Sequence, residues 1–520
     1  SPYLEAELFD IKFAQSADVM YICHENHAVR KLSRTGHTSW SLTEVDFTDG
    51  PYLDSNISTT TLTTTHHTVG TGRTLTASSN IFVSTDVGRL VRFRDGYGKI
   101  TGYTSATVVT WQVLKDTGSA SASTNWSLGA FSDTTGHPKC VSFFEQRLVF
   151  AGTTDQPQTL FFSQSGDYEN MDDGLSGSVT DSSAMVYTIA SNQVNAITSI
   201  KATRTLIVMT TGGEFTVTSG AAEDPVTPTN LNIRKQSSYG SAGVDALSIG
   251  NTTIFLQRAK RKIRELAYNF DSDGYIAPDL TILSENITLS GLIQIDYQQE
   301  PYSVVWGVRT DGKLVGMTYN RIQDVVAWHE HDFGGTNAKC KSVAVIDIDT
   351  SEDQVWVVVE RTINGATKKY VEYLTPSDFN SNIEEFHYVD SGLAYNGSAT
   401  TTLTGLDHLE GETVKIIANG ATHPDKIVSS GSITKRIYDV TVRFFETVGA
   451  KVGPDEDNLD IIPFRDSSAA MTAPVPLFTG DKETEFPSDY GTNGFVVVKQ
   501  DQPLPTTILA IYARLEIYDT

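Results

Sequence analysis

The sequence predicts an all-β protein, a β-propeller with an inserted small β-domain and a C-terminal β-region. Apolar and polar residues alternate with a period of two over short runs, as they do in half-buried strands. Turn residues such as Asn-Gly and Asp-Gly join these runs in pairs. The 40 glycines and the long Thr/Ser-rich stretches favour short strands and turns over long helices.

Hairpin units recur along most of the chain, and we predict about six of them between residues 16 and 375. The strongest turn chemistry lies at Asp311-Gly312, at Gly212-Gly213 and at Asn364-Gly365. The predicted hairpins span 19–36, 145–171, 205–220, 252–268, 305–319 and 355–374. Units of roughly 40–50 residues with two hairpins each are typical of propeller blades, and a series of β-sandwiches is the alternative.

The predicted domains are a first blade region (1–50), an inserted β-domain (51–135), the remaining blades (136–378) and a C-terminal β-domain (379–520). In the last of these we predict hairpins at 409–420 and 438–453. Residues 431–440 run from one strand into the next without turn residues, and the chain starts abruptly at Ser1. We therefore expect that residues are missing near Ile433 and before Ser1.

The net charge of the chain limits the kinds of molecule that most of its surface can bind. The chain has 39 Lys and Arg against 63 Asp and Glu, a net charge of −24, which repels nucleic acid phosphates and anionic lipid. No apolar run approaches the roughly 18 residues of a membrane-spanning helix, so we predict no membrane span. Cys23, Cys140 and Cys340 are scattered and odd in number, which favours buried free thiols.

Two charged clusters are the candidate interaction sites. The dense basic cluster, at the predicted turn of the 252–268 hairpin, is a candidate subunit interface, with a tip charged for solubility or a brief phosphate contact as the alternatives. It consists of Arg258, Lys260, Arg261, Lys262 and Arg264. The acidic loop has oxygen ligands at calcium-like spacing but lacks the central Gly and terminal Glu of an EF-hand, which favours a solvated turn. It consists of Asp455, Glu456, Asp457 and Asp460.

Catalytic and metal signatures are weak in this sequence. His329 and His331 alternate along a predicted strand, a spacing that can chelate a metal, but no third ligand is near them in the sequence. The chain has no Gly-x-Ser-x-Gly, no Walker motif and no sialidase-type Asp box. We predict no catalytic residue, no metal and no cofactor.

Several strings in the sequence resemble the tail nozzle proteins of short-tailed bacteriophages (the tail tubular protein B type). They are PYLEAELFDIKFAQSADVMYI, RKLSRTGHTSWSL, FFEQRLVFAGTTDQPQTLFFSQSGDYENM, QSSYGS and LDHLEGETVKIIANGATHPD. The resemblance is most specific over 1–45, 138–172 and 403–425. It departs from the family in two places, because relatives have a β-rich segment before PYLEAEL and some tens more residues near Ile433.

The resemblance implies a propeller subunit without enzymatic activity. Six copies would form a homo-hexameric ring around the channel through which genomic DNA is ejected. The ring would dock on the tail adaptor, contact tail fibres or other tail proteins, and let double-stranded DNA pass without tight binding. Its place would be the virion tail, after assembly in the host cytoplasm, and the acidic loop would lie near the channel or an interface. The alternative is a tail-tip propeller that binds or degrades host-surface polysaccharide.

Overall fold

The computed structural model describes most of the residues of the chain. They are 1–191, 195–220, 224–348, 352–375, 390–392, 407–409, 417–418, 421–422, 436–465, 474–486 and 496–516. The chain divides into two compact units, Ser1–Glu330 (unit 1) and His331–Thr520 (unit 2), which we describe separately. The predicted domain boundaries at 50, 135 and 378 stay predictions.

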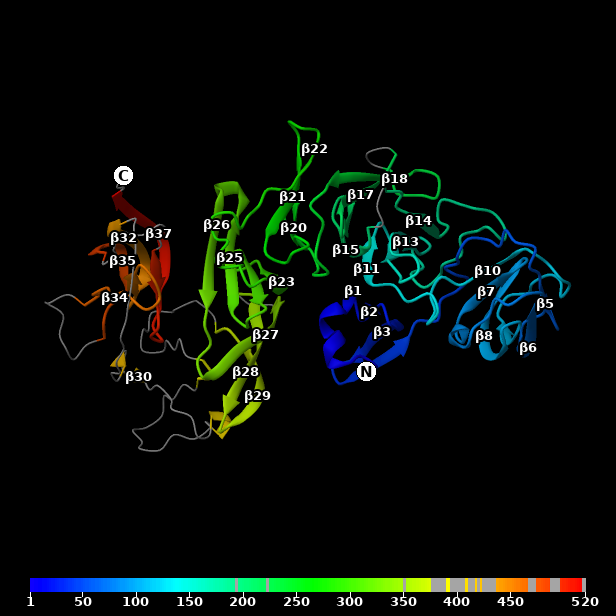
Figure 1. The fold of residues 1–520 in the computed structure, drawn as a ribbon, viewed down its shortest axis with the longest axis horizontal. Helices are drawn as coiled ribbons and strands as arrows, with labels where there is room; N and C mark the ends of the chain where they lie inside the picture. Colours follow the sequence, from blue (N-terminus) through cyan, green and yellow to red (C-terminus); the bar gives the residue numbers. More distant parts are fainter. Residues whose placement is uncertain are drawn as a thin grey trace. The chain divides into compact units, whose positions relative to one another are not determined.

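Unit 1 contains a series of four-stranded antiparallel sheets in which the strands follow chain order, as in propeller blades (Figure 1). The first sheet has β1 (Lys12–Ser16), β2 (Val19–His24), β3 (His27–Gly36) and β4 (Ser39–Glu44). The second has β11 (Cys140–Phe144), β12 (Arg147–Ala151), β13 (Thr159–Phe162) and β14 (Met185–Thr188). The third has β15 (Ile197–Ala202), β16 (Leu206–Thr210), β17 (Gly213–Ser219) and β18 (Leu231–Ser237).

Two further sheets complete this series. The fourth has β19 (Leu247–Ile249), β20 (Thr252–Leu256), β21 (Ile263–Asn269) and β22 (Gly274–Ile276). The fifth has β23 (Leu292–Gln298), β24 (Val304–Arg309), β25 (Leu314–Asn320) and β26 (Val325–His331). First strands of consecutive sheets contact one another, β1 with β11, β11 with β15 and β19 with β23, as inner strands of blades do. The predicted propeller-type all-β fold is therefore confirmed.

The second strand of most blades is buried along its whole length. Strands β12, β16, β20 and β24 have no residue that is more than marginally exposed. Their sequences RLVFA, LIVMT, TTIFL and VVWGVR are nearly continuous apolar runs, the pattern of a strand that is covered on both faces. Because neighbouring sheets pack on both faces of these strands, their sequences do not alternate between apolar and polar residues.

Local turn chemistry explains the hairpins. Glu145 and Gln146 join β11 to β12 with φ angles of 45° and 61°, and two consecutive left-handed residues form the tight turn that matches strand twist. All six predicted hairpins are confirmed as antiparallel pairs: β2–β3, β12–β13, β16–β17, β20–β21, β24–β25 and β28–β29. The described helices are single 3-10 turns or little more: η1 (Glu5–Asp10), η2 (Ser84–Asp86), η3 (Arg321–Gln323) and η5 (Asp407–Leu409).

A six-stranded sheet is inserted along the chain between the first and second blades, and most of its strands are labelled in Figure 1. Its order is β10-β7-β8-β9-β6-β5. The strands are β5 (Leu62–Thr64), β6 (Gly70–Ala77), β7 (Leu90–Phe93), β8 (Gly96–Ser105), β9 (Val108–Val113) and β10 (Trp126–Leu128). Its core, which includes Phe82, Phe93 and Trp111, forms a cluster of its own. The predicted inserted β-structure is present.

A buried polar network joins the inserted sheet to the second blade. The guanidinium of Arg92 donates to both carboxylate oxygens of Asp173, at 3.0 and 2.7 Å, and lies 4.1 Å from the ring centre of Tyr52. The hydroxyl of Tyr52 donates to buried Asp49, which also accepts from Lys115. Burial, with the nearby charge of Asp172, raises the pKa of Asp49.

Unit 2 is also built from small β-sheets. A three-stranded sheet has β27 (Thr336–Ile346), β28 (Gln354–Ile363) and β29 (Ala366–Tyr373), and a short pair has β30 (Ile417–Ala418) and β31 (Ala421–Thr422). Two more three-stranded sheets share one apolar core. They contain β35 (Phe478–Glu485), β32 (Arg436–Thr447) and β37 (Thr507–Glu516), and β34 (Asp460–Ile461), β33 (Lys451–Gly453) and β36 (Val497–Lys499).

The predicted hairpin at 438–453 is wrong. Strand β32 pairs with β35 and β37, whereas β33 pairs with β34 and β36 in the other sheet. The chain turns between them with left-handed Glu446 and Gly449, but it crosses to a second sheet so that Phe444 and Val452 share one core. The alternation of apolar and polar residues predicts which face of a strand is buried, but it does not predict which strand pairs with it. The predicted hairpin at 409–420 and the expected gap near Ile433 lie largely or wholly outside the described residues.

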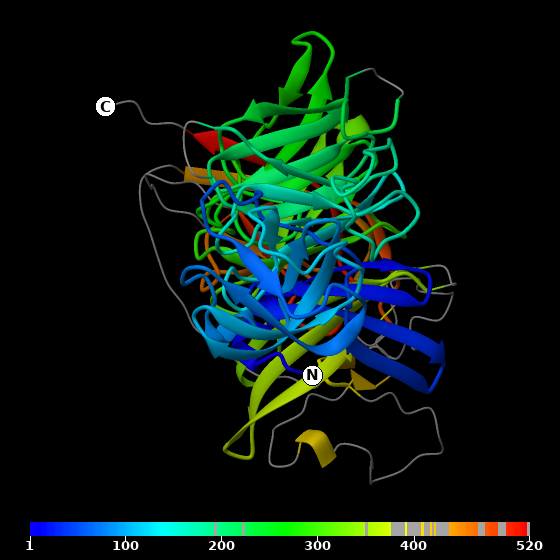
Figure 2. The same cartoon turned by 90° about the vertical axis from the view of Figure 1, so that its right-hand side faces the viewer.

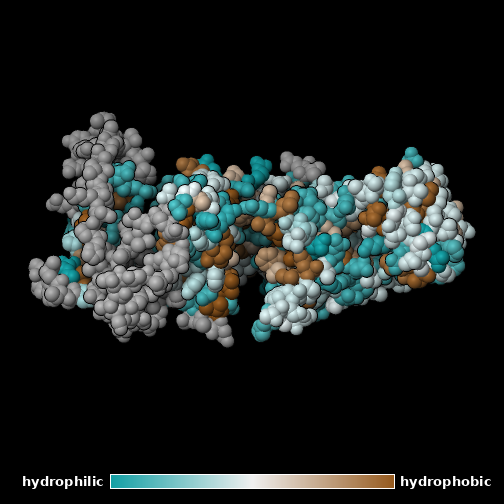
Figure 3. All heavy atoms as spheres, turned by 90° about the horizontal axis from the view of Figure 1, so that it is seen from below, coloured by the Kyte–Doolittle hydropathy of each residue, from teal (hydrophilic) through white to brown (hydrophobic). Residues whose placement is uncertain are grey.

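The three cysteines are buried free thiols, as predicted, and burial raises the pKa of each. In the described part of the chain, no helix is long and apolar enough to cross a membrane. Exposed apolar side chains occur among polar ones, and the face seen from below carries several separate apolar areas (Figure 3).

Candidate functional site

The basic cluster lies on the turn between β20 and β21, and the structure divides it into two groups. Lys262 is half-buried and paired within the chain, because its Nζ lies 2.6 Å from Asp279 Oδ2 and 2.6 Å from Glu285 Oε1. These hydrogen bonds raise the pKa of Lys262. Arg264 stacks 3.6 Å from the ring centre of Tyr239 and donates 2.7 Å to a main-chain carbonyl. Both side chains therefore brace the turn.

The other members, Arg258, Lys260 and Arg261, form what we call the basic tip. All three are exposed, and no carboxylate among the described residues pairs with their side chains. The turn beneath them is fixed, since Leu292 N–H donates to the Lys260 carbonyl and Thr288 Oγ1 donates to the Arg261 carbonyl, both at 2.7 Å. The basic tip is a fixed surface with unpaired positive charge.

The acidic loop lies between β33 and β34 as a surface bend. Asp455 Oδ1 accepts the main-chain N–H groups of Asp457 and Asn458, each at 2.9 Å, so this carboxylate stabilises the bend. Glu456 lies 3.4 Å from Lys499, and Asp457 and Asp460 are exposed. Asp455 is thus engaged by the local main chain.

Of the two histidines predicted as a possible metal pair on β26, His329 packs against neighbouring residues. The ring of His329 lies edge-on to Trp306 at 5.6 Å and covers Gly316, where a Cβ atom would lie 2.0 Å from the ring. Burial lowers the pKa of His331 to about 4, which keeps this imidazole neutral at physiological pH.

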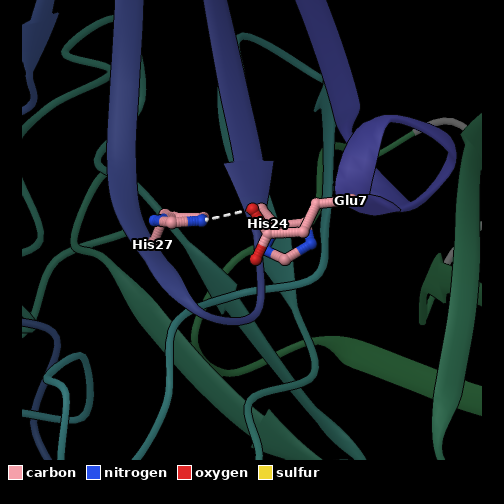
Figure 4. Close-up of side chains that lie close together, drawn as sticks. All are labelled: Glu7, His24 and His27. Atoms are coloured by element: carbon pink, nitrogen blue, oxygen red, sulfur yellow. Dashed lines mark hydrogen bonds and ion pairs between the residues drawn. The ribbon is translucent and has the colours of Figure 1, made fainter. Parts of the chain in front are cut away.

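A cluster that the sequence analysis missed brings Glu7, His24 and His27 together (Figure 4). Within the described residues it is the only group of three such side chains whose potential ligand atoms all lie within 4.8 Å of one another. Glu7 comes from η1, and His24 and His27 flank the β2–β3 turn. Glu7 Oε2 lies 2.8 Å from His27 Nε2 and accepts the Leu4 N–H at 2.9 Å.

The hydrogen bonds of this cluster do not suit a metal ion. His24 Nδ1 accepts the main-chain N–H of Asn26 at 3.2 Å, so the proton of the neutral ring is on Nε2. Burial lowers the pKa of His24 and favours this neutral ring. A metal-binding histidine gives one nitrogen to the metal and donates a hydrogen bond from the other, which His24 cannot do here. We assign the cluster to holding η1 on the β2–β3 turn.

This contact is expected to make stability depend on acid pH. The Leu4 N–H, followed by His27, lowers the pKa of Glu7 from 4.5 to about 2. Because the folded-state pKa lies below the unfolded value, Glu7 stabilises the fold above pH 4.5, and that contribution disappears as the pH falls toward 2. Denaturant unfolding of Glu7→Gln near pH 5 and near pH 3 should show a smaller loss of stability on acidification than the unmutated chain. An equal loss in both proteins would contradict this assignment.

Comparison with known proteins gives weak structural similarities. No family model and no curated protein matches the chain. Partial structural matches include the WD40 domain of Neurospora crassa Pan2, at 8% identity and a TM-score of 0.30, covering 71% of this chain and 89% of that one. They also include the Cps50 (Swd1) β-propeller domain of Myceliophteria thermophila, at 10% identity and a TM-score of 0.29, covering 57% and 88%. An auxiliary nutrient binding protein from Bacteroides thetaiotaomicron matches at 11% identity and a TM-score of 0.26, covering 64% and 88%. At these values the likeness carries no functional information, and the fold assignment rests on the sheets described above.

Proposed function

We propose that this chain is a structural subunit of the tail nozzle of a short-tailed bacteriophage. In this proposal, six copies surround the channel for ejected DNA in the virion tail, dock on the tail adaptor and contact other tail proteins. They assemble in the host cytoplasm and have no catalytic role. The proposal rests on the resemblance of the quoted sequence strings to nozzle proteins, and the electrostatics of the structure support it.

The supporting observation is that intramolecular ion pairs occupy many of the basic side chains. Lys31 binds Glu169 at 2.6 Å, Arg92 binds Asp173 at 2.7 Å, and Lys262 binds Asp279 at 2.6 Å. In a chain with a net charge of −24, this pairing removes part of the positive charge that could otherwise bind phosphate groups. An acidic channel wall would repel DNA and let it slide, whereas proteins that hold DNA present basic grooves.

The packing of the blades is suited to a rigid structural subunit. Their second strands are buried on both faces, and close-packed interiors resist deformation. A ring built from such blades would keep its bore while DNA passes.

Electron-microscopic averaging of the particles formed by the full chain, with no symmetry imposed, tests the proposal. We expect a six-fold ring around an axial channel. A trimer, or a single propeller with a side pocket, would contradict it. Incubation with host capsule should release no reducing ends, and their release would support the polysaccharide-degrading alternative instead.

A further inference from the structure

The fourth blade of unit 1 has ends of opposite character, and we propose that neighbouring copies of the chain bind one another through these ends. The basic tip of one copy would contact the turn between β21 and β22 of the next copy. This inference deepens the proposed function, because it names the surfaces that join the subunits of the proposed assembly.

The β21–β22 turn is acidic and aromatic. We call Tyr268, Phe270, Asp271 and Asp273 the acidic tip. Phe270 is 86% exposed, the highest value among the aromatic side chains that the structure describes, and Tyr268 beside it is 50% exposed. Both aspartates are exposed as well.

The acidic tip is held in one conformation. Tyr268 donates its hydroxyl to Asp273 Oδ1 at 2.7 Å and packs edge-on against Tyr275, with ring centres 5.8 Å apart. Asn269 Oδ1 accepts the N–H of Ser272 at 3.0 Å. An exposed aromatic on a pre-formed turn loses little conformational entropy on binding, which is the character of an interface anchor.

The two tips lie at opposite ends of strand β21. Successive turns of an antiparallel meander alternate between the ends of the sheet, and the seven residues of β21 span about 23 Å. The β21–β22 hairpin projects beyond its neighbouring strands in both ribbon views (Figure 1 and Figure 2). Contact between two different surfaces is heterologous, and it generates a ring where the rotation between copies closes.

Charge and apolar area are complementary between the tips. The unpaired cations of the basic tip would face the two carboxylates of the acidic tip. Exposed Ile282, Leu283 and Leu289 lie in the segment between β22 and β23, which is joined to the basic tip by the hydrogen bond from Thr288 Oγ1 to the Arg261 carbonyl, and they offer apolar area to Phe270. Because each copy has a net charge of −24, copies repel one another except where a positive surface is present. The basic tip is such a surface.

A mixing experiment with two full-length variants tests the contact. One variant reverses the basic tip (Arg258→Glu with Arg261→Glu), and the other disables the acidic tip (Phe270→Ala with Asp271→Lys). In sedimentation velocity at low salt, we expect the unmutated chain to assemble and each variant alone to remain monomeric, with self-association weakened roughly 100-fold or more. An equimolar mixture should form dimers and nothing larger, because each variant keeps one intact tip.

The control reverses charge at the end of β15 and in the turn after it, with Lys201→Glu and Arg204→Glu, and should assemble as the unmutated chain does. Variants that assemble normally, or a mixture that stays monomeric, would overturn the proposed contact. If both variants still form six-fold rings in the electron microscope, the contact is wrong and the nozzle proposal stands. If the mixture forms dimers but the unmutated chain forms open filaments or rings of another order, the contact stands and the hexameric nozzle is wrong.

Discussion

Replacing Arg147 by methionine is expected to lower the free energy of unfolding of unit 1 by about 3–5 kcal/mol. Arg147 begins β12 and is only 2% exposed. Its guanidinium donates to the carbonyls of Ser163 at 2.7 Å, Asp181 at 2.6 Å, Ser182 at 3.3 Å and Ser183 at 2.8 Å. Methionine has a similar length but no donor, so the carbonyls of Ser163 and Ser183 would lose these hydrogen bonds in a buried part of the site.

Hydrogen exchange localises this effect. Peptides that cover 163 and 181–185 should exchange faster in Arg147→Met, and the denaturant midpoint of unit 1 should fall. Arg147→Lys keeps the positive charge and a donor group, so its loss of stability should be smaller than that of Arg147→Met. Some loss should remain, because an ammonium group cannot reach all four acceptors. Arg204→Met removes an exposed arginine and should stay within about 0.5 kcal/mol of the unmutated chain. Unchanged exchange at 181–185 in Arg147→Met would show that other groups hold this loop.

The sequence was informative where structure depends on neighbouring residues. Asn364-Gly365 adopts left-handed φ angles of 47° and 75° in the β28–β29 turn, which a tight hairpin requires and which these residue types tolerate. The buried second strands are apolar runs in the sequence, although they lack the alternation that we predicted for the strands. Both features depend on residues within a few positions of one another along the chain, so they can be predicted without knowledge of tertiary contacts.

Features that depend on distant residues could not be predicted. Nothing near Lys262 or Arg264 in the sequence shows that Asp279 and Tyr239 would engage them and leave only three cations at the tip. The meeting of Glu7 with the β2–β3 turn depends on how η1 folds back, and no known motif has that spacing. The acidic tip was overlooked because its charge is small in an acidic chain, and its exposure became visible only in the structure.

The second large effect is expected for Trp111→Ala in the inserted sheet, at about 3–5 kcal/mol. Trp111 of β9 is fully buried, and its Nε1–H donates to Thr64 Oγ1 on β5 at 3.0 Å. The indole also covers Gly98 of β8, where a Cβ atom would lie 2.6 Å from the ring. The substitution therefore leaves a cavity between three strands and removes one hydrogen bond from the buried Thr64 hydroxyl, which still donates to the His66 carbonyl. Trp40→Ala, which truncates a 55% exposed indole, is the control and should change stability by less than about 1 kcal/mol.

The extent of the damage would show whether the inserted sheet is an independent folding unit. Its core cluster is separate from the cluster that contains Phe150 and Phe161 of the second blade. Hydrogen exchange in Trp111→Ala should therefore rise across 62–128 while β12 and β16 keep their protection. Equal loss of protection in the blades would contradict this expectation. It would mean that the buried Arg92–Asp173 pair couples the inserted sheet to the second blade strongly enough for both to unfold together.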